Sequence, residues 1–267
     1  MKNIGFLGCG NMGSAIMRGI INAGTFTKNA IFVFDPDKEK MNSFAESTGV
    51  IPVANEAGLV LNSDIIMLCI KPQKFSEVLP KIKENIGGKL VISIAAGKNT
   101  ESIGELIGKD KKICRIFPNL NANVNAAVSA YCGNENASAE DLAQTGEIAS
   151  SFGDAMFLDE KDFSCFGVLG GCVPAFAFMF IDALRKTAEE NGLDPEVAYK
   201  ASCQAVLGSA KLLKEKGGDM EQWVKRVCSP GGTTIEGVTS LREDGFEESV
   251  RKAFEKSLEK DKELQSK

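Results

Sequence analysis

The sequence contains no histidine, so it lacks the side chain that most often acts as a general acid–base and that commonly binds zinc. Its eight cysteines include no C-x-x-C pair and form no cluster that would replace the missing imidazoles. We therefore expect no metal site. Because most of these cysteines lie within apolar stretches, we predict that they are buried and reduced, as in a cytosolic protein.

A block of positive charge is also absent. The formal net charge of -5 results from 31 basic and 36 acidic residues that are interspersed along the chain. This pattern offers no basic stripe for DNA or RNA, and we expect no nucleic-acid partner. With 267 residues, of which 43% are hydrophobic and 25% charged, the composition is that of a globular protein of one or two domains.

One stretch, residues 163–181, is long and uncharged enough to raise the question of a membrane span. It contains three glycines and a proline, and Asp162 and Asp182 flank it. We expect it to form the core of a helical domain or of a subunit interface, because a helix that is apolar all round is normally a buried one. A strand pattern begins at residue 3, which leaves no room for a signal peptide, and we predict a cytoplasmic protein without a membrane partner.

The first feature with a chemical meaning is a G-x-G-x-x-G run at residues 8–13, between an apolar strand pattern at residues 3–7 and an amphipathic helix pattern. Gly8 permits a tight turn, Gly10 lets the backbone approach a pyrophosphate, and Gly13 lets the helix pack on the strand. A glycine-rich turn kept for packing alone is the alternative. The strand–turn–helix context favours dinucleotide binding. The predicted contacts of the dinucleotide in this run are Gly8, Gly10, Asn11, Met12 and Gly13.

Short apolar runs alternate with amphipathic stretches up to residue 159. Parallel strands are expected at residues 3–7, 30–34, 64–70, 89–94 and 112–117, and candidates for antiparallel edge strands are residues 124–132 and 155–158. The expected helices between them cover residues 11–23, 37–47, 75–83, 100–107 and 138–151. Alternation of this kind predicts an α/β fold of the Rossmann type, a mostly parallel sheet with helices on both faces.

The pattern changes to helix beyond this point. Residues 163–191 are expected to form one long buried helix, residues 195–216 a second helix, and residues 245–267 an amphipathic helix with a charged outer face. We therefore predict two domains, a dinucleotide-binding domain over residues 1–159 and an all-helical domain over residues 160–267.

Asp35 ends the second expected strand, at a position from which an acid accepts hydrogen bonds from the adenosine ribose hydroxyls and repels a 2′-phosphate. This placement favours NAD over NADP. Lys38 and Lys40 follow closely, however, and their ammonium groups could reach a phosphate. Pro36 and Asp37 leave a second interpretation open, in which the acid belongs to a capped helix start.

Two further loops follow expected parallel strands, whose carboxyl ends border the cofactor crevice in folds of this type. The first loop consists of Ile70, Lys71 and Pro72. The second loop consists of Ala95, Ala96 and Gly97. The small side chains of the second loop allow a flat ring to approach the backbone. Either loop taken alone is compatible with ordinary turn structure. Together with the glycine run, the two loops predict a site for the nicotinamide half of the cofactor.

The stretch Ser229-Pro-Gly-Gly-Thr-Thr234 precedes a helical pattern. Thr233 and Glu236 form a capping-box pair, so a capped helix start after a turn is one interpretation. Two glycines and two threonines are more than capping needs, and successive N–H groups at such a helix N-terminus form a site for a carboxylate. We predict an anion site here.

The missing histidine also restricts the reaction. Dehydrogenases of hydroxy acids need a general acid–base for the alcohol proton, commonly histidine or lysine, and residues 163–181 contain neither. A protonated imine accepts a hydride without such a group. Hydride transfer to an imine then depends mainly on positioning and on binding of the substrate carboxylate.

Taken together, these motifs resemble the pyrroline-5-carboxylate reductases over essentially the whole chain. They are G-F-L-G-C-G-N-M-G at 5–13, I-K-P-Q at 70–73, A-A-G at 95–97, R-I-F-P-N at 115–119, G-G-C-V-P-A-F at 170–176 and S-P-G-G-T-T at 229–234. The resemblance implies reduction of 1-pyrroline-5-carboxylate to L-proline with NADPH or NADH, the last step of proline biosynthesis. It also implies a C-terminal helical dimerisation domain and a homodimer, which in this family can assemble into a decamer, a pentamer of dimers.

The resemblance further assigns roles to single residues. It places Asn55 near the adenosine ribose, and it places the catalytic threonine, near the ring nitrogen of the substrate, at Thr234. The loop residues expected to bind the substrate are Ser229, Gly231, Gly232, Thr233 and Thr234.

The chain departs from the family pattern at Gly170, where serine is usual, and at Val173, where glycine is usual. These changes keep two alternatives open: a reductase of a related cyclic imino acid, and a non-catalytic dinucleotide-binding dimeric sensor. Asp35 stands where many relatives carry a small polar residue followed by arginine, so a preference for NADP does not follow from the resemblance.

Overall fold

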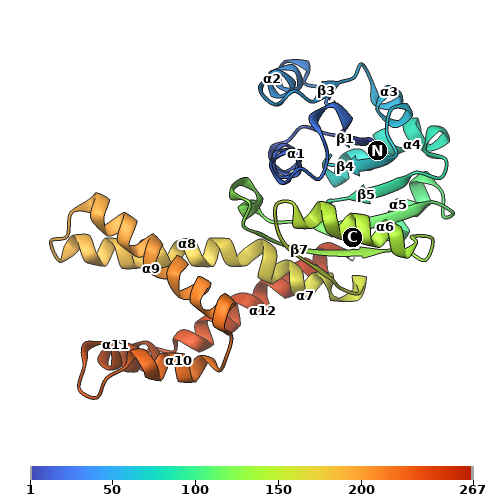
Figure 1. Ribbon diagram of the computed structural model, residues 1–267. Helices are drawn as coiled ribbons and strands as arrows, with labels where there is room; N and C mark the ends of the chain where they lie inside the picture. The colour runs from blue at the N-terminus through green and yellow to red at the C-terminus, as the bar shows by residue number, and fades with distance from the viewer. Residues whose placement is uncertain (1, 266–267) are drawn as a thin grey trace. The chain divides into compact units, whose positions relative to one another are not determined.

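The computed structural model describes residues 2–265 and divides into two compact units, Met1–Gly171 with Lys260–Lys267 and Cys172–Glu259. The first unit contains an eight-stranded sheet in the order β3-β2-β1-β4-β5-β6-β7-β8 (Figure 1). The strands are β1 (Ile4–Leu7), β2 (Ile31–Phe34), β3 (Ile51–Pro52), β4 (Ile65–Leu68), β5 (Leu90–Ser93), β6 (Lys112–Phe117), β7 (Ala127–Gly133) and β8 (Gly153–Phe157). β1 to β6 run parallel, β7 is antiparallel to β6, and β8 is parallel to β7.

Helices connect these strands. Those of the first unit are α1 (Asn11–Ala23), α2 (Lys38–Thr48), α3 (Glu56–Leu61), α4 (Phe75–Ile86), α5 (Thr100–Ile107), α6 (Ala139–Ser150) and α7 (Phe163–Gly167). Its 3-10 turns are η1 (Lys28–Ala30), η2 (Pro72–Lys74), η3 (Leu120–Val124) and η4 (Glu160–Asp162). A π-helix, η5 (Val168–Cys172), leads into the second unit. The second unit contains α8 (Val173–Glu190), α9 (Pro195–Lys216), α10 (Met220–Val227), α11 (Thr233–Glu243) and most of α12 (Phe246–Gln265).

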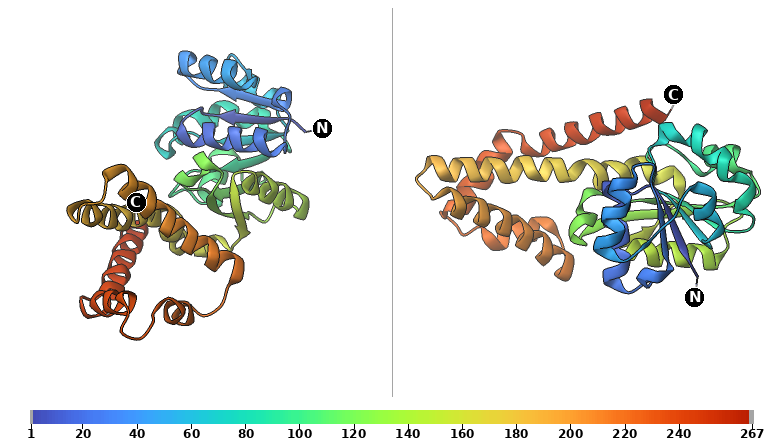
Figure 2. Two further views of the ribbon diagram at one scale, coloured as in Figure 1. Left: turned by 60° about the vertical axis from the view of Figure 1, so that its left-hand side comes forward. Right: turned by 90° about the horizontal axis from the view of Figure 1, so that it is seen from above.

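The central strands are apolar at every position because helices cover both faces of the sheet. Alternate side chains of one strand enter different cores: Ile4 and Phe6 of β1 enter the first core, and Leu7 enters the second. α1, α2 and α6 contribute to the first core, and α3, α4 and α5 contribute to the second (Figure 2). Because β1 to β6 run parallel, the loops that follow these strands lie at one edge of the sheet.

The α/β fold predicted from the sequence is confirmed, including the two strands of opposite direction at the sheet edge. The sequence analysis missed β3, α3 and α10. These elements have two, six and eight residues, which is too short for hydrophobic periodicity to distinguish them from loops.

The prediction of one long helix over residues 163–191 is wrong. α7 ends at Gly167, the π-helix η5 follows, and α8 begins at Val173. Gly170 and Gly171 lie within the π-helix, where glycine disfavours a regular α-helical turn.

The first compact unit also extends past the predicted domain boundary at residue 159, to Gly171. The reason lies in the packing of α7, because Phe163 and Phe166 form a core cluster with Ala130 and Cys132 of β7. The assignment of functions to the two predicted domains stays a prediction.

The second unit buries few of its apolar side chains. α8 contains no buried residue, and Phe178 and Met179 are 55% and 73% exposed. Among the described residues, the helical stretch Glu160–Glu190 is long and apolar enough to span a membrane, with a mean hydropathy of 1.9 and 22% of its most apolar window buried. Within one chain α8 is therefore not the buried core of a helical domain. The alternative prediction, a subunit interface, stays a prediction.

Candidate active site

The glycine loop after β1 has a shape that side chains would obstruct. Gly8 adopts a φ of 110°, and a Cβ atom there would lie 2.6 Å from the carbonyl oxygen of Cys69. A Cβ atom at Gly13 would lie 2.7 Å from the carbonyl oxygen of Gly8. Both positions thus require glycine for the close packing of strand, turn and helix.

Gly10 serves a different purpose in the same loop. It is the N-cap of α1 and offers no side-chain cap, and a Cβ atom there would meet no heavy atom within 4 Å. The backbone at the start of α1 is therefore open to an approaching group, and the first-turn N–H groups and the positive end of the helix dipole suit a phosphate. This cradle fits the pyrophosphate of a dinucleotide.

Asp35 follows β2 and is held in place by two backbone groups. The N–H of Cys9 donates to its Oδ2 at 2.7 Å, and the N–H of Asp37 donates to its Oδ1 at 3.0 Å. The helix cap that the sequence left open belongs to Asp37, whose Oδ1 accepts from the N–H of Lys40 at 3.1 Å. The carboxylate of Asp35 is thus fixed beside the glycine loop; its contact with a ribose stays a prediction.

The other predicted cofactor residues also lie in loops that follow parallel strands. Ile70, Lys71 and Pro72 follow β4, and Ala95 to Gly97 follow β5, so both loops lie at the same sheet edge as the glycine loop. Asn55 follows β3 and accepts a hydrogen bond from the N–H of Gly58 at 2.8 Å as the N-cap of α3. The structure brings these residues to one edge; their contacts with a cofactor stay a prediction.

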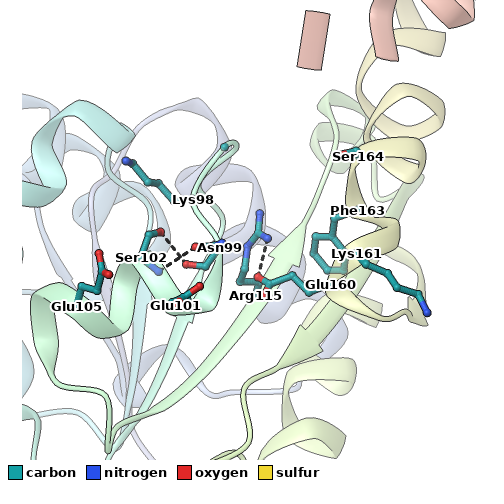
Figure 3. Close-up of a pocket in the computed structure, with 11 residues that line it drawn as sticks. Lys98, Asn99, Glu101, Ser102, Glu105, Arg115, Glu160, Lys161, Phe163 and Ser164 are labelled. Carbon is teal, nitrogen blue, oxygen red and sulfur yellow. Dashed lines mark hydrogen bonds and ion pairs between the residues drawn. The ribbon is translucent and has the colours of Figure 1, made fainter. Parts of the chain in front are cut away.

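A cavity of about 600 Å³ opens beside the loop after β5 (Figure 3). Its walls are formed by residues 97–105 on one side and by residues 160–164 on the other, with Arg115 of β6 between them. Nη1 of Arg115 lies 2.7 Å from Oε1 of Glu160. The sequence analysis missed this ion pair, although an arginine within the buried strand β6 is a signal for an acidic partner.

The prediction that the cysteines are buried is confirmed for three of the eight and is wrong for Cys165. All eight are free, with Cys9, Cys114 and Cys132 buried and Cys165 exposed. Burial raises the pKa of Cys9, raises that of Cys114 to about 11 and raises that of Cys132 to about 12. In residues 2–265, no group of three or more acidic or cysteine side chains is placed to hold a metal ion.

The predicted anion loop lies in the second unit. The N–H of Gly232 donates to the carbonyl oxygen of Ser229 at 3.0 Å, and Gly231 between them has a φ of 68°. This is a turn with proline second and a glycine of positive φ third, as in type II. A Cβ atom at Gly232 would lie 2.3 Å from Oγ of Ser229 and 3.1 Å from its carbonyl oxygen, so a larger residue there would displace the serine hydroxyl.

The predicted capping box of Thr233 and Glu236 is wrong. α11 begins at Thr233 itself, and its N-cap, Gly232, makes no side-chain hydrogen bond. Thr233 and Thr234 are both exposed. The N–H groups of the first turn of α11 are thus left without a side-chain cap, which suits a carboxylate ligand.

A structural link joins the π-helix to the end of β6. Nδ2 of Asn119 donates to the carbonyl oxygen of Gly170 at 2.9 Å, and the residue is 4% exposed. A Cβ atom at Gly170 would lie 3.3 Å from Cε1 of Phe166. The position therefore accepts a small side chain after a slight shift of the phenyl ring.

Two family profiles match the chain. Residues 3–97 match the profile described as NADP oxidoreductase coenzyme F420-dependent, and residues 160–264 match the one described as pyrroline-5-carboxylate reductase dimerisation. The chain is 37% identical over 264 residues to the pyrroline-5-carboxylate reductase of Escherichia coli, and the alignment covers 98% of both chains. The chain belongs to the pyrroline-5-carboxylate reductase family.

Solved structures of this family have the same fold. The pyrroline-5-carboxylate reductase of Coxiella burnetii matches with a TM-score of 0.93 and 31% identity over 98% of each chain. The pyrroline carboxylate reductase of Plasmodium falciparum, solved with NADP bound, matches with a TM-score of 0.89 and 31% identity over 99% of this chain and 98% of that one. The resemblance read from the motifs is thereby confirmed at the level of the family and the fold.

Proposed function

We propose that this protein is an NAD(P)H-dependent oxidoreductase that reduces 1-pyrroline-5-carboxylate to L-proline by transfer of a hydride to the C=N carbon. The observation that carries this proposal is the similarity to named pyrroline-5-carboxylate reductases over nearly the full length of both chains. The open glycine loop after β1 supports it, because that loop fits a dinucleotide.

The loops at the carboxyl edge of the sheet are proposed to hold the cofactor. Gly8, Gly10 and Gly13 would admit the pyrophosphate, Asp35 would bind the adenosine ribose, and residues 95–97 would border the nicotinamide ring. The bound cofactor supplies the hydride. The role of the chain is to hold the ring and the imine in the orientation that transfer requires.

The turn before α11 is proposed to bind the substrate. Its uncapped N–H groups would receive the carboxylate, with Ser229 and Thr233 at the edges of the loop. The hydroxyl of Thr234 would lie near the ring nitrogen and act as the catalytic group. Because a protonated imine needs no further proton to accept a hydride, this site works in a chain without histidine.

The assembly is proposed to be a cytoplasmic homodimer, with a pentamer of dimers as a larger form. The apolar side chains that α8 exposes, among them Phe178 and Met179, support a partner surface supplied by a second copy. A dimer interface also accounts for the hydropathy of residues 160–190 without a membrane.

The experiment that tests the function follows the loss of reduced-nicotinamide absorbance with 1-pyrroline-5-carboxylate, in parallel reactions with NADH and NADPH. Rapid oxidation that yields proline supports the proposal. Binding of both cofactors without oxidation would instead support the dimeric sensor. Oxidation with a six-membered cyclic imino acid but not with 1-pyrroline-5-carboxylate would assign a related substrate, with Gly170 and Val173 as the first residues to test.

A further inference from the structure

The carboxylate of Glu160 receives three hydrogen bonds from two elements that are distant in the sequence. Its Oε1 accepts from Nη1 of Arg115 at 2.7 Å and from the N–H of Thr100 at 2.8 Å. Its Oε2 accepts from the hydroxyl of Thr100 at 2.8 Å. One carboxylate thus joins η4, the strand β6 and the first residue of α5.

This junction is largely withdrawn from solvent. The side chain of Arg115 is 8% exposed and that of Glu160 is 29% exposed. The guanidinium carbon of Arg115 also lies 4.9 Å from the ring centroid of Phe163. A buried ion pair of this kind is stable when its remaining donors and acceptors are satisfied, and removal of one partner leaves the other charge unpaired.

The loop between β5 and α5 depends on this junction at one of its ends. The described hydrogen bonds hold residues 95–100 at their two ends. The N–H of Ala95 donates to Oγ of Ser93 at one end. At the other end Asn99 caps α5 by accepting from Ser102, and Thr100 donates to Glu160. Between these ends, Gly97 has a φ of 71° and is exposed. The cavity of about 600 Å³ lies between this loop and residues 160–164, with the ion pair at its base (Figure 3).

We propose that Glu160, held by Arg115, is a positioning residue that fixes the loop of residues 95–100 in the conformation that receives the nicotinamide half of the dinucleotide. This proposal rests on the proposed function, since it takes residues 95–97 as the border of the nicotinamide ring. It assigns Glu160 no contact with the cofactor. Glu160 instead holds Thr100 through its N–H and hydroxyl groups, and Thr100 fixes the end of the loop that would contact the cofactor.

The test compares two ligands that differ in the nicotinamide ring. NADH binding is followed by its fluorescence, and ADP-ribose binding by calorimetry, in the wild type and in Glu160→Gln. The substitution keeps the size of the side chain and lets its amide donate to the hydroxyl of Thr100, but it removes the negative charge that pairs with Arg115. We expect about tenfold weaker binding of NADH and unchanged binding of ADP-ribose.

Two further variants make the result specific. Glu101→Gln removes the same charge from the opposite wall of the same cavity, but Glu101 is exposed and makes no described contact with Thr100, so both affinities should stay unchanged. Thr100→Val removes one donor to the carboxylate and should weaken NADH binding less than Glu160→Gln does. It also serves as the decisive variant if Glu160→Gln does not fold.

An equal loss of affinity for both ligands, or no loss for either, would overturn the proposal. The comparison needs no imine, so its outcome is separate from that of the proposed function. A wild type that binds NADH but does not reduce 1-pyrroline-5-carboxylate would refute the proposed function. The comparison of NADH with ADP-ribose would still decide the positioning role of Glu160.

Discussion

The two compact units differ in how far they bury their apolar side chains. In the first unit, the phenyl ring of Phe6 and the side chain of Ile66 are fully buried between sheet and helices. In the second unit, Phe178 and Met179 of α8 are more than half exposed. The first unit therefore has an extensive core of its own, whereas α8 of the second unit presents an apolar surface that the chain itself does not cover. We therefore expect the stability of the first unit to come mainly from burial within one chain, and that of the second unit to depend on the proposed dimer.

The largest expected effect is that of Phe6→Ala. Loss of a buried phenyl ring costs about 3 to 5 kcal/mol, since it combines lost transfer free energy with a cavity. Chemical denaturation should give this decrease in the free energy of unfolding at every protein concentration. The matched variant is Phe178→Ala, whose destabilisation should be small in dilute protein and grow to a plateau as the protein concentration rises, because it acts through association. A concentration-independent effect at Phe178 would remove the contrast between the units.

Met179→Glu should convert the dimer into monomers. The substitution places a carboxylate on an apolar surface that association would bury, and burial of an unpaired charge is costly. Light scattering after size-exclusion chromatography measures the mass. Met156→Glu is the control, because Met156 of β8 is also exposed, at 42%, but belongs to the first unit. A wild type that is already monomeric would contradict the proposed role of α8.

Thr234→Ala should lower kcat about 10- to 100-fold, because the proposed hydroxyl that positions the ring nitrogen is lost. The dissociation constant of NADH should not change, since the proposed cofactor loops lie in the first unit. Thr239→Ala, on the exposed side of the same helix, is the control. Unchanged turnover in Thr234→Ala would remove this threonine from the catalytic role.

Asp35→Ser should raise the ratio of kcat/KM for NADPH over NADH about tenfold, because it removes a carboxylate held where a 2′-phosphate would lie. Asp37→Ser removes the same charge two residues further on. It should leave the cofactor ratio unchanged and cost about 1 kcal/mol of stability as a lost helix cap. An equal shift in both variants would indicate a general effect of charge and not a ribose contact.

Gly170→Ser should have the smallest effect. The added side chain displaces the ring of Phe166 only slightly, and we expect a change in unfolding free energy below about 1 kcal/mol. Turnover should stay close to that of the wild type if the unusual glycine is compatible with catalysis. A large gain in turnover would show that the glycine had reduced activity, and would favour the sensor as the state of the natural chain.

Much of the first unit could be predicted from local patterns. The alternation of buried strands and amphipathic helices gave the sheet, and the glycine run at residues 8–13 lies where a dinucleotide loop should lie. The capping box at Thr233 was wrong because a helix start depends on backbone angles, and Gly232 already provides them as the N-cap. The sequence left two roles open for Asp35, and hydrogen bonds decided that Asp37 caps α2.

The network around Glu160 could not be predicted in the same way. Its partners are Thr100, 60 residues away, and Arg115, 45 residues away. No periodicity connects such positions, because their meeting depends on the order of strands and on the packing of η4 and α7 against β7.

The sequence alone determined the class of the fold, because that class depends on apolar patterns that local geometry repeats at a spacing of two or near four residues. It also determined the place of the glycine loop and the family, because these depend on short contiguous motifs. The tertiary structure decided which carboxylate meets which donor and where the compact units divide. It also decided that the apolar face of α8 stays uncovered within one chain. These properties depend on contacts between segments that are distant in the sequence, and such contacts form only when the chain folds.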